Sequence, residues 1–213
     1  RNLYKEQFNR VAPQYQANVN INGGTDRVKY FVSFGYFRQE GITNAVEYYG
    51  SETGSTFNRY NFRSNFDINI TDNLKITVNS AGQFGETTGP GNVADPYNIS
   101  ERYKIIMQYI YDSNPFISPG IIDGKLISGF AGTTSLIQNP LATKVDSKIG
   151  MQNAVYNLLQ SGSGTIFNSL LDNSIKLDHT MDYIHPNLKV YATVSYQDNY
   201  NRYVKFTPSI PSY

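Results

Sequence analysis

The chain has 213 residues, among them 18 Tyr and 12 Phe but no Trp and no Cys. The lack of Cys excludes a disulfide framework, thiol catalysis and a Cys-based zinc site, and a net charge of +1 gives no electrostatic case for nucleic acid binding. No run of about 18 apolar residues is present, so the sequence predicts no transmembrane helix.

The first predicted element is a hairpin at residues 14–38, after a lead-in at 1–13. Its apolar residues recur with period two, which is typical of a strand with one apolar and one polar side. They are Tyr15, Ala17, Val19 and Ile21 before the turn, and Val28, Tyr30, Val32, Phe34 and Tyr36 after it. A two-residue turn at Gly24-Thr25 would pair Ile21 with Val28 on the apolar face.

A second hairpin is predicted at 58–85, after a loop at 39–57. Its first strand alternates between an apolar and a polar set of side chains. The apolar set is Tyr60, Phe62, Phe66, Ile68 and Ile70, and the polar set is Asn61, Arg63, Asn65, Asp67 and Asn69. A three-residue turn at 71–73 would pair Ile70 with Leu74, so the hydrophobic phase and the turn agree.

Residues 86–170 interrupt the alternation and are predicted to form one long loop. Asp95-Pro96 is a typical helix start, and Ile99, Tyr103, Ile106 and Ile110 follow at helical spacing, which predicts a helix at 97–111. Its apolar stripe must be buried, either against its own loop or against another protein. A second short helix is a candidate near 150–160. Loops of this length usually carry function.

A third hairpin is predicted at 171–201, with a turn at 184–187 and a loop at 202–213. Ile175, Leu177, His179, Met181 and Tyr183 share the apolar side of its first strand, and the apolar side of its second strand consists of Leu188, Val190, Ala192, Val194 and Tyr196. Short turns therefore lie at one end of the hairpins and long loops at the other, as in outer-membrane barrels. The predicted strands reach the roughly 9–11 residues that a tilted membrane strand needs. Six strands cannot close a wide barrel, so we expect an internal segment of a longer protein.

Two blocks of the sequence resemble a known family. The first block comprises NGGTD at 22–26, YFVSFGY at 30–36 and EGI at 40–42, and the second comprises RYNFRSN at 59–65 and DNLK at 72–75. Shorter loop motifs are NPF at 114–116, DG at 123–124 and NPL at 139–141. Together they resemble the SusC/RagA-type TonB-dependent transporters of the Bacteroidetes outer membrane over about two thirds of the chain.

This resemblance implies the fold class and the partners. It implies an all-β, antiparallel transmembrane barrel of 22 strands with a plug domain inside it. Residues 1–213 would form the N-terminal part of that barrel, after the plug, with about six strands and one long extracellular loop that carries a helix. The family imports oligosaccharides, peptides or similar nutrients with energy from TonB, and a SusD-like surface lipoprotein covers the barrel. No cofactor is implied.

Two groups of residues are candidate binding positions. On the polar side of the second hairpin, Arg63 lies between Asn61 and Asn65, with Asp67 farther along. These side chains would contact a plug or a polar substrate, or Arg63 would simply pair with a carboxylate such as Asp67 in a solvated interior. The second group consists of loop aromatics that would stack on sugar rings or anchor their loops. Its members are Tyr48, Tyr49, Tyr97 and Phe116.

The sequence gives no support for catalysis. His179 lies in a predicted strand and His185 beside a turn, and neither has partners at a legible metal or catalytic spacing. We therefore expect a transport protein and not an enzyme. Two other interpretations stay open: a soluble or secreted β-rich module of the glycan-binding or adhesin type, and an outer-membrane scaffold that does not transport.

Overall fold

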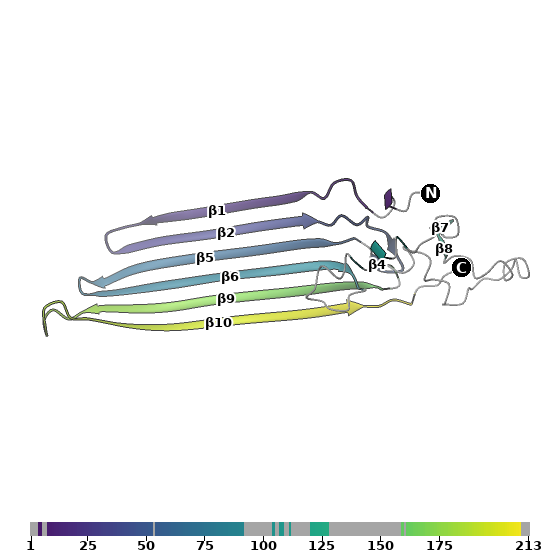
Figure 1. The fold of residues 1–213 in the computed structure, drawn as a ribbon. Coiled ribbons are helices and arrows are strands. Elements are labelled where there is room, and N and C mark those ends of the chain that lie inside the picture. The colour runs from purple at the N-terminus through teal and green to yellow at the C-terminus, as the bar shows by residue number, and fades with distance from the viewer. Residues whose placement is uncertain are drawn as a thin grey trace, which may run out of the picture.

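The computed structural model describes residues 4–5, 8–52, 54–91, 104, 107–108, 111, 120–127, 159 and 161–209. Six long strands form one antiparallel sheet in the order β1-β2-β5-β6-β9-β10, so each long strand pairs with the next long strand along the chain (Figure 1). The strands are β1 Gln14–Gly24, β2 Val28–Glu40, β5 Thr56–Thr71, β6 Leu74–Pro90, β9 Ser163–Thr180 and β10 Lys189–Phe206. The predicted antiparallel all-β fold is thus confirmed.

The connections differ at the two ends of the sheet. At one end, the chain turns between β1 and β2, between β5 and β6, and between β9 and β10 (Figure 1). At the other end the chain leaves β2 and β6, and the connections that follow these strands hold two small hairpins, β3 Glu47–Tyr48 with β4 Ser51–Glu52 and β7 Gly120–Ile122 with β8 Lys125–Ile127. Below, these are called the short-turn end and the loop end.

Both small hairpins turn through two residues with positive φ. These angles are 51° at Tyr49 and 75° at Gly50, and 50° at Asp123 and 72° at Gly124. Two consecutive residues of this conformation form the turn whose twist matches that of the flanking strands. The Asp-Gly pair noted in the sequence therefore supplies the backbone conformation that this turn requires.

Five of the six strands extend beyond their predicted bounds at the loop end. β2 runs to Glu40, β5 begins at Thr56, β6 runs to Pro90, β9 begins at Ser163 and β10 ends at Phe206. The additional residues of β6 and β9 are rich in Gly, Ser and Thr and lack clear alternation, so the sequence predicted loops there. Pairing with the adjacent strand overrides the local preference. One example is the cross-strand pair of hydroxyls between Thr56 Oγ1 and Thr88 Oγ1, 2.7 Å apart.

The predicted register of the first hairpin is wrong by four residues. Ile21 pairs with Val32 and not with Val28, because β1 continues to Gly24 before the chain turns. The Thr25 backbone N–H donates to Val28 O over 2.6 Å, and Thr25 Oγ1 accepts from the Val28 backbone N–H over 3.2 Å. Since four is an even number, the error leaves every side chain on its predicted face.

The other two short turns also differ in detail from the prediction. Thr71, and not Ile70, pairs with Leu74, and the register shifts between Asn69 and Thr71 as in a β-bulge. β9 ends at Thr180, so the predicted strand positions 181 and 183 belong to the turn instead. That turn is closed by a hydrogen bond from the Met181 backbone N–H to Leu188 O, 2.8 Å long.

The short-turn ends of the strands are staggered across the sheet. The first residue of β2, Val28, is level with Ile68 of β5 and, through β6, with Leu177 of β9. Both of these strands continue for three more residues toward the short turns, to Thr71 and Thr180. A stagger of this kind accompanies the strand tilt that allows a sheet to close into a barrel.

The two predicted helices lie mostly outside the described residues. Within 97–111, the described residues are 104, 107, 108 and 111, and their backbone is helical. Within 150–160, only Leu159 is described, and it is also helical and fully buried. In the described part of the chain, no helix is long and apolar enough to cross a membrane.

The sheet has almost no hydrophobic core of its own. Phe8, Leu159 and Ile166 are the buried hydrophobic residues in the described part of the chain. Apolar side chains of the long strands are instead largely exposed, for example Val19 at 59% and Val194 at 73%. A sheet of this size must bury such a surface against something else, whether lipid or protein.

Candidate functional site

The apolar side chains of the six strands collect on one face of the sheet, called the apolar face. Registered partners share a face, so the pairing places most of them on the same side. Leu74, His179 and Val190 lie nearest the short turns on this face, and the next two rows are Val28, Ile68, Ile76, Leu177 and Ala192, then Tyr30, Phe66, Val78, Ile175 and Val194. Tyr30, Tyr36, Tyr60 and Tyr196 lie on the apolar face as predicted, whereas Tyr183 lies in a turn.

Aromatic rings form a row across the apolar face. Ring centroids are 5.0 Å apart for Tyr36 and Tyr60, 6.2 Å for Phe62 and Phe84, and 6.4 Å for Phe84 and Phe167. A Cβ at Gly82 would collide with the Phe62 ring, so this ring covers the backbone where no side chain is present.

Charged side chains appear on the apolar face at the loop end of the aromatic row. Arg38 Nη2 and Glu40 Oε1 are 2.7 Å apart in an ion pair on β2. Tyr36, the last aromatic residue of this face on β2, therefore stands between apolar side chains and a charged pair. This order is the one expected where a membrane meets water.

Amide and hydroxyl side chains occupy the opposite side of the sheet, called the polar face. Arg63 lies near the middle of this face, level with Ser33 of β2 and Ala81 of β6. On its own strand, Asn61 and Asn65 flank it on the same face. Arg63 is exposed, and it makes no hydrogen bond or ion pair with another described residue.

The interpretation in which Arg63 pairs with Asp67 is wrong. Asp67 Oδ2 lies 3.0 Å from Lys75 Nζ, and Asp67 Oδ1 accepts a hydrogen bond of 2.8 Å from Thr77 Oγ1. Four residues along an extended strand span about 13 Å, which is too far for direct pairing of Arg63 with Asp67. The adjacent strands offer no carboxylate at the level of Arg63 either, because the residues paired with it there are Ser33 and Ala81.

The two predicted asparagines have different neighbours. Asn61 is level with Gly35, and a Cβ at that glycine would lie 2.7 Å from both Asn61 Nδ2 and Asn18 Oδ1. The two amides therefore converge above the glycine. Asn65 is level with Phe31 of β2 and with Asn79 of β6. The structure thus brings Arg63 and both asparagines into one continuous polar surface.

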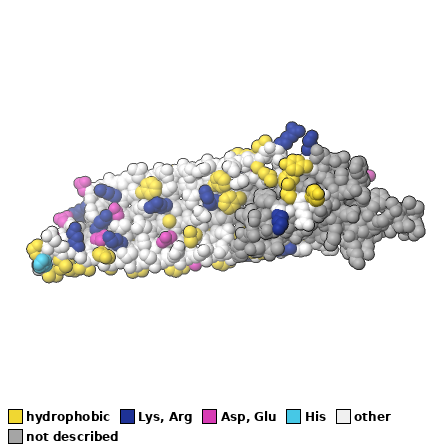
Figure 2. Space-filling model, in the orientation of Figure 1, with side chains coloured by type: hydrophobic (Ala, Val, Ile, Leu, Met, Phe, Trp, Pro, Cys, Tyr) yellow, Lys and Arg dark blue, Asp and Glu magenta, His cyan; other side chains and the backbone are white. Residues whose placement is uncertain are grey.

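The two faces differ in net charge. Across the six long strands, the polar face carries seven cationic and three anionic side chains, for a net charge of +4. These are Lys29, Arg59, Arg63, Lys75, Lys176, Lys189 and Lys205, and Asp67, Asp172 and Asp178. The apolar face carries Arg38 and Arg202 against Glu40, Glu86 and Asp198. Figure 2 shows charged side chains gathered toward the short-turn end, at the left.

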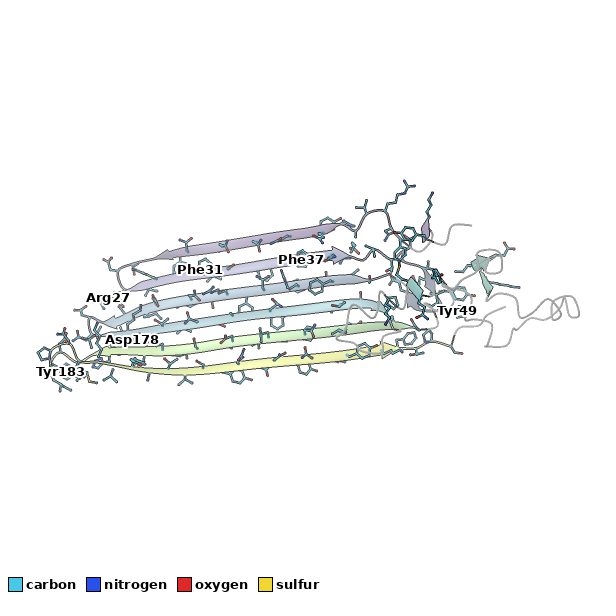
Figure 3. All side chains as sticks on the ribbon, in the orientation of Figure 1. Arg27, Phe31, Phe37, Tyr49, Asp178 and Tyr183 are labelled. Atoms are coloured by element: carbon cyan, nitrogen blue, oxygen red, sulfur yellow. The ribbon has the colours of Figure 1, made fainter. Side chains whose placement is uncertain are left out.

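Salt bridges at the short-turn end neutralise part of this charge. Lys176 Nζ lies 2.7 Å from Asp178 Oδ1 and 5.6 Å from the centroid of the Tyr191 ring. Figure 3 places Asp178 near this end of the sheet, close to the turn that carries Tyr183. The cations of the polar face nearer the middle and the loop end, Arg63, Arg59 and Lys205, have no such carboxylate partner among the described residues.

A second group on the polar face, nearer the loop end, was not predicted from the sequence. The Arg59 guanidinium carbon lies 5.3 Å from the centroid of Phe37, whose ring is 6.0 Å from that of Phe57. Arg59 Nε is buried and has no hydrogen-bond partner among the described residues. Figure 3 labels Phe37 near the loop end of β2. The sequence feature that could have predicted this group is the presence of Phe37 and Phe57 on the polar side of their strands.

The loop aromatics fall into two groups. The Tyr48 hydroxyl donates to Gly124 O over 3.3 Å and thereby joins the β3–β4 hairpin to the β7–β8 hairpin, which is the behaviour of a loop anchor. Tyr49 packs on Tyr48 with ring centroids 4.7 Å apart and is 61% exposed at the loop end (Figure 3). Tyr97 and Phe116 lie outside the described residues.

The two histidines have local contacts. His179 Nε2 lies 3.3 Å from the Tyr183 hydroxyl, and His185 Nδ1 lies 3.0 Å from Pro186 O. Among the described residues, no three His, Cys, Asp or Glu side chains are grouped so that they could hold a metal ion.

Part of the chain is similar to a TonB-dependent receptor. The similarity is 42% identity over 64 residues with TonB-dependent receptor P26 of Formosa agariphila. This match covers 30% of the present chain and 6% of that protein, so the chain spans a small part of the relative's length. No protein-family model matches the chain.

Proposed function

We propose that this chain forms part of the wall of a TonB-dependent outer-membrane transporter. The observation that carries the proposal is the division of one sheet into an apolar and a polar face, combined with the similarity to a TonB-dependent receptor. The apolar face contacts lipid, and the polar face lines the interior of the barrel. The short turns lie in the periplasm and the loop end lies outside the cell.

The free edges of the sheet support the need for further strands. β1 has 11 residues, all exposed, and β10 has 18 residues, and each pairs with a described strand on one side only. Unpaired backbone groups along strands of this length are too costly in lipid, because no water is present to satisfy them. Additional strands therefore pair with β1 and with β10 and complete the barrel.

The finer proposal is a transporter of the SusC/RagA type that imports an oligosaccharide or a peptide. The sequence blocks at 22–42 and 59–75 support this subfamily. In this proposal TonB supplies energy through a region outside the present chain, and a SusD-like lipoprotein covers the loop end. Arg63, Asn61 and Asn65 contact the plug or the transported compound, and the chain carries no catalytic role.

A membrane extraction of the native full-length protein tests the proposal. We expect a detergent-dependent species whose migration on a gel changes on boiling, because closed barrels resist unfolding until they are heated. A SusD-like lipoprotein should be recovered with it. Loss of nutrient uptake on deletion of the gene would separate a transporter from a non-transporting scaffold.

A water-soluble folded protein would overturn the proposal. It would favour a secreted β-rich binding module, in which the apolar face packs against a second sheet and not against lipid. A membrane-inserted barrel whose deletion leaves every uptake rate unchanged would instead favour the scaffold.

A further inference from the structure

The geometry of the polar face points to a binding position for an oxyanion. We infer that Arg63, framed by Asn61 and Asn65, binds a carboxylate, sulfate or phosphate group of the compound that passes along this face. The inference rests on the proposed function, since it assumes that the polar face lines a transport path. It goes beyond that function by stating that the transported compound is negatively charged.

The surroundings of Arg63 leave its guanidinium uncovered. The cross-strand residues at its level are Ser33 and Ala81, whose side chains are too short to cover an arginine. The side chains of Asn61 and Asn65 lie one step away on either side along β5. Arg63 itself is exposed to the space in front of the polar face. The guanidinium is therefore open to an incoming group, and an amide side chain lies next to it on either side along β5.

The carboxylates of the polar face do not neutralise Arg63. Asp67 is bound to Lys75 and Asp178 to Lys176. Asp172 is level with Arg63, but Ala81 on the intervening strand separates the two. Two strand spacings place their backbones about 10 Å apart, and no ion pair joins them among the described residues. The cationic excess of this face therefore includes a central group without an internal partner.

The chemistry of these side chains favours an anion over a neutral polar compound. A guanidinium presents paired N–H donors that match the two oxygens of a carboxylate or sulfate, and such hydrogen bonds are about twice as strong as neutral ones. Asparagine Nδ2 adds further donors. The excess of positive charge over the whole face also attracts anions from a distance. A neutral compound would gain neither the stronger, charge-assisted hydrogen bonds nor the attraction from a distance.

Protection of Arg63 from chemical modification tests the inference on the full-length protein. The protein is folded in detergent, checked for the change in migration on boiling, and treated with phenylglyoxal, with and without sodium sulfate as the probe. Peptide mass spectrometry then gives the modification rate of each arginine. Arg27, exposed in the first short turn, is the matched control. Sodium chloride of equal ionic strength and sucrose are the solute controls.

We expect sulfate to slow the modification of Arg63 by about five-fold relative to Arg27, the factor that about 1 kcal/mol of selective binding produces. Chloride and sucrose should leave the ratio unchanged. Equal rates with and without sulfate would overturn the inference. An Arg63 that does not react even without sulfate would also overturn it, because another part of the protein would then cover the guanidinium. A protein that fails the boiling check refutes the proposed barrel instead, so the two failures are distinguishable.

Discussion

Arginine at Val78 should destabilise the folded protein far more than arginine at the next residue, Asn79. Val78 lies on the apolar face between Phe66 of β5 and Ile175 of β9, whereas Asn79 lies on the polar face. Val78 is four residues beyond Leu74, the first residue of β6. With a rise of about 3.3 Å per residue and a tilt of about 40°, this places it about 10 Å from the short-turn end.

That height is close to the middle of an apolar band about 25 Å tall, where an outward-facing arginine costs about 2–4 kcal/mol. We therefore expect V78R to lose about that free energy of unfolding, and N79R to change it by less than about 1 kcal/mol, as usual for solvent-exposed positions. The assay is a urea titration of the full-length protein in phospholipid vesicles. The folded fraction is read from the change in migration on boiling.

A third variant separates lipid from a packed protein core. V78F adds volume, which fluid lipid accommodates at little cost but which a close-packed core resists by about 1–3 kcal/mol. The reasoning is refuted if V78F is destabilised to that extent, because the apolar face would then pack against protein. It is also refuted if V78R and N79R lose equal stability.

Two further predictions concern single contacts. G82A should be about 1 kcal/mol less stable than G85A in the same titration, because a methyl group at residue 82 displaces the Phe62 ring whereas residue 85 has room. Equal stabilities would show that the ring is not held over the glycine. D67N should lose less than about 1 kcal/mol, because the Asp67–Lys75 pair is 42% exposed on both sides and water screens it. A larger loss would indicate that another part of the protein buries this pair.

The sequence was sufficient to assign the faces of the strands but not their register. Assignment to a face depends only on the period-two pattern, and it was correct for the tyrosines at 30, 36, 60 and 196. Register depends on the turn, where Thr25 Oγ1 contacts the backbone N–H groups of residues 27 and 28 and delays the reversal. Two alternatives that differ by an even number of residues satisfy the hydrophobic pattern equally well.

The candidate binding residues show the same limit. The polar side of Arg63, Asn61 and Asn65 followed from alternation alone. The partner of Asp67 did not, because the choice between Arg63 and Lys75 depends on which strands are adjacent and at what register. The Arg59–Phe37 contact was missed for a related reason, since phenylalanine on a polar side does not fit the alternation that identifies a strand.

The connection between β6 and β9 has a consequence for how the protein can vary. It comprises residues 91–162, or 72 residues, yet β6 and β9 pair along their whole length. Closing such a long segment costs free energy that grows only with the logarithm of its length, about 0.6 kcal/mol for each doubling. Tens of residues could therefore be added to or removed from this connection while the pairing of the two strands persists. A lineage could therefore change the length and composition of this connection and keep the six-stranded sheet unchanged.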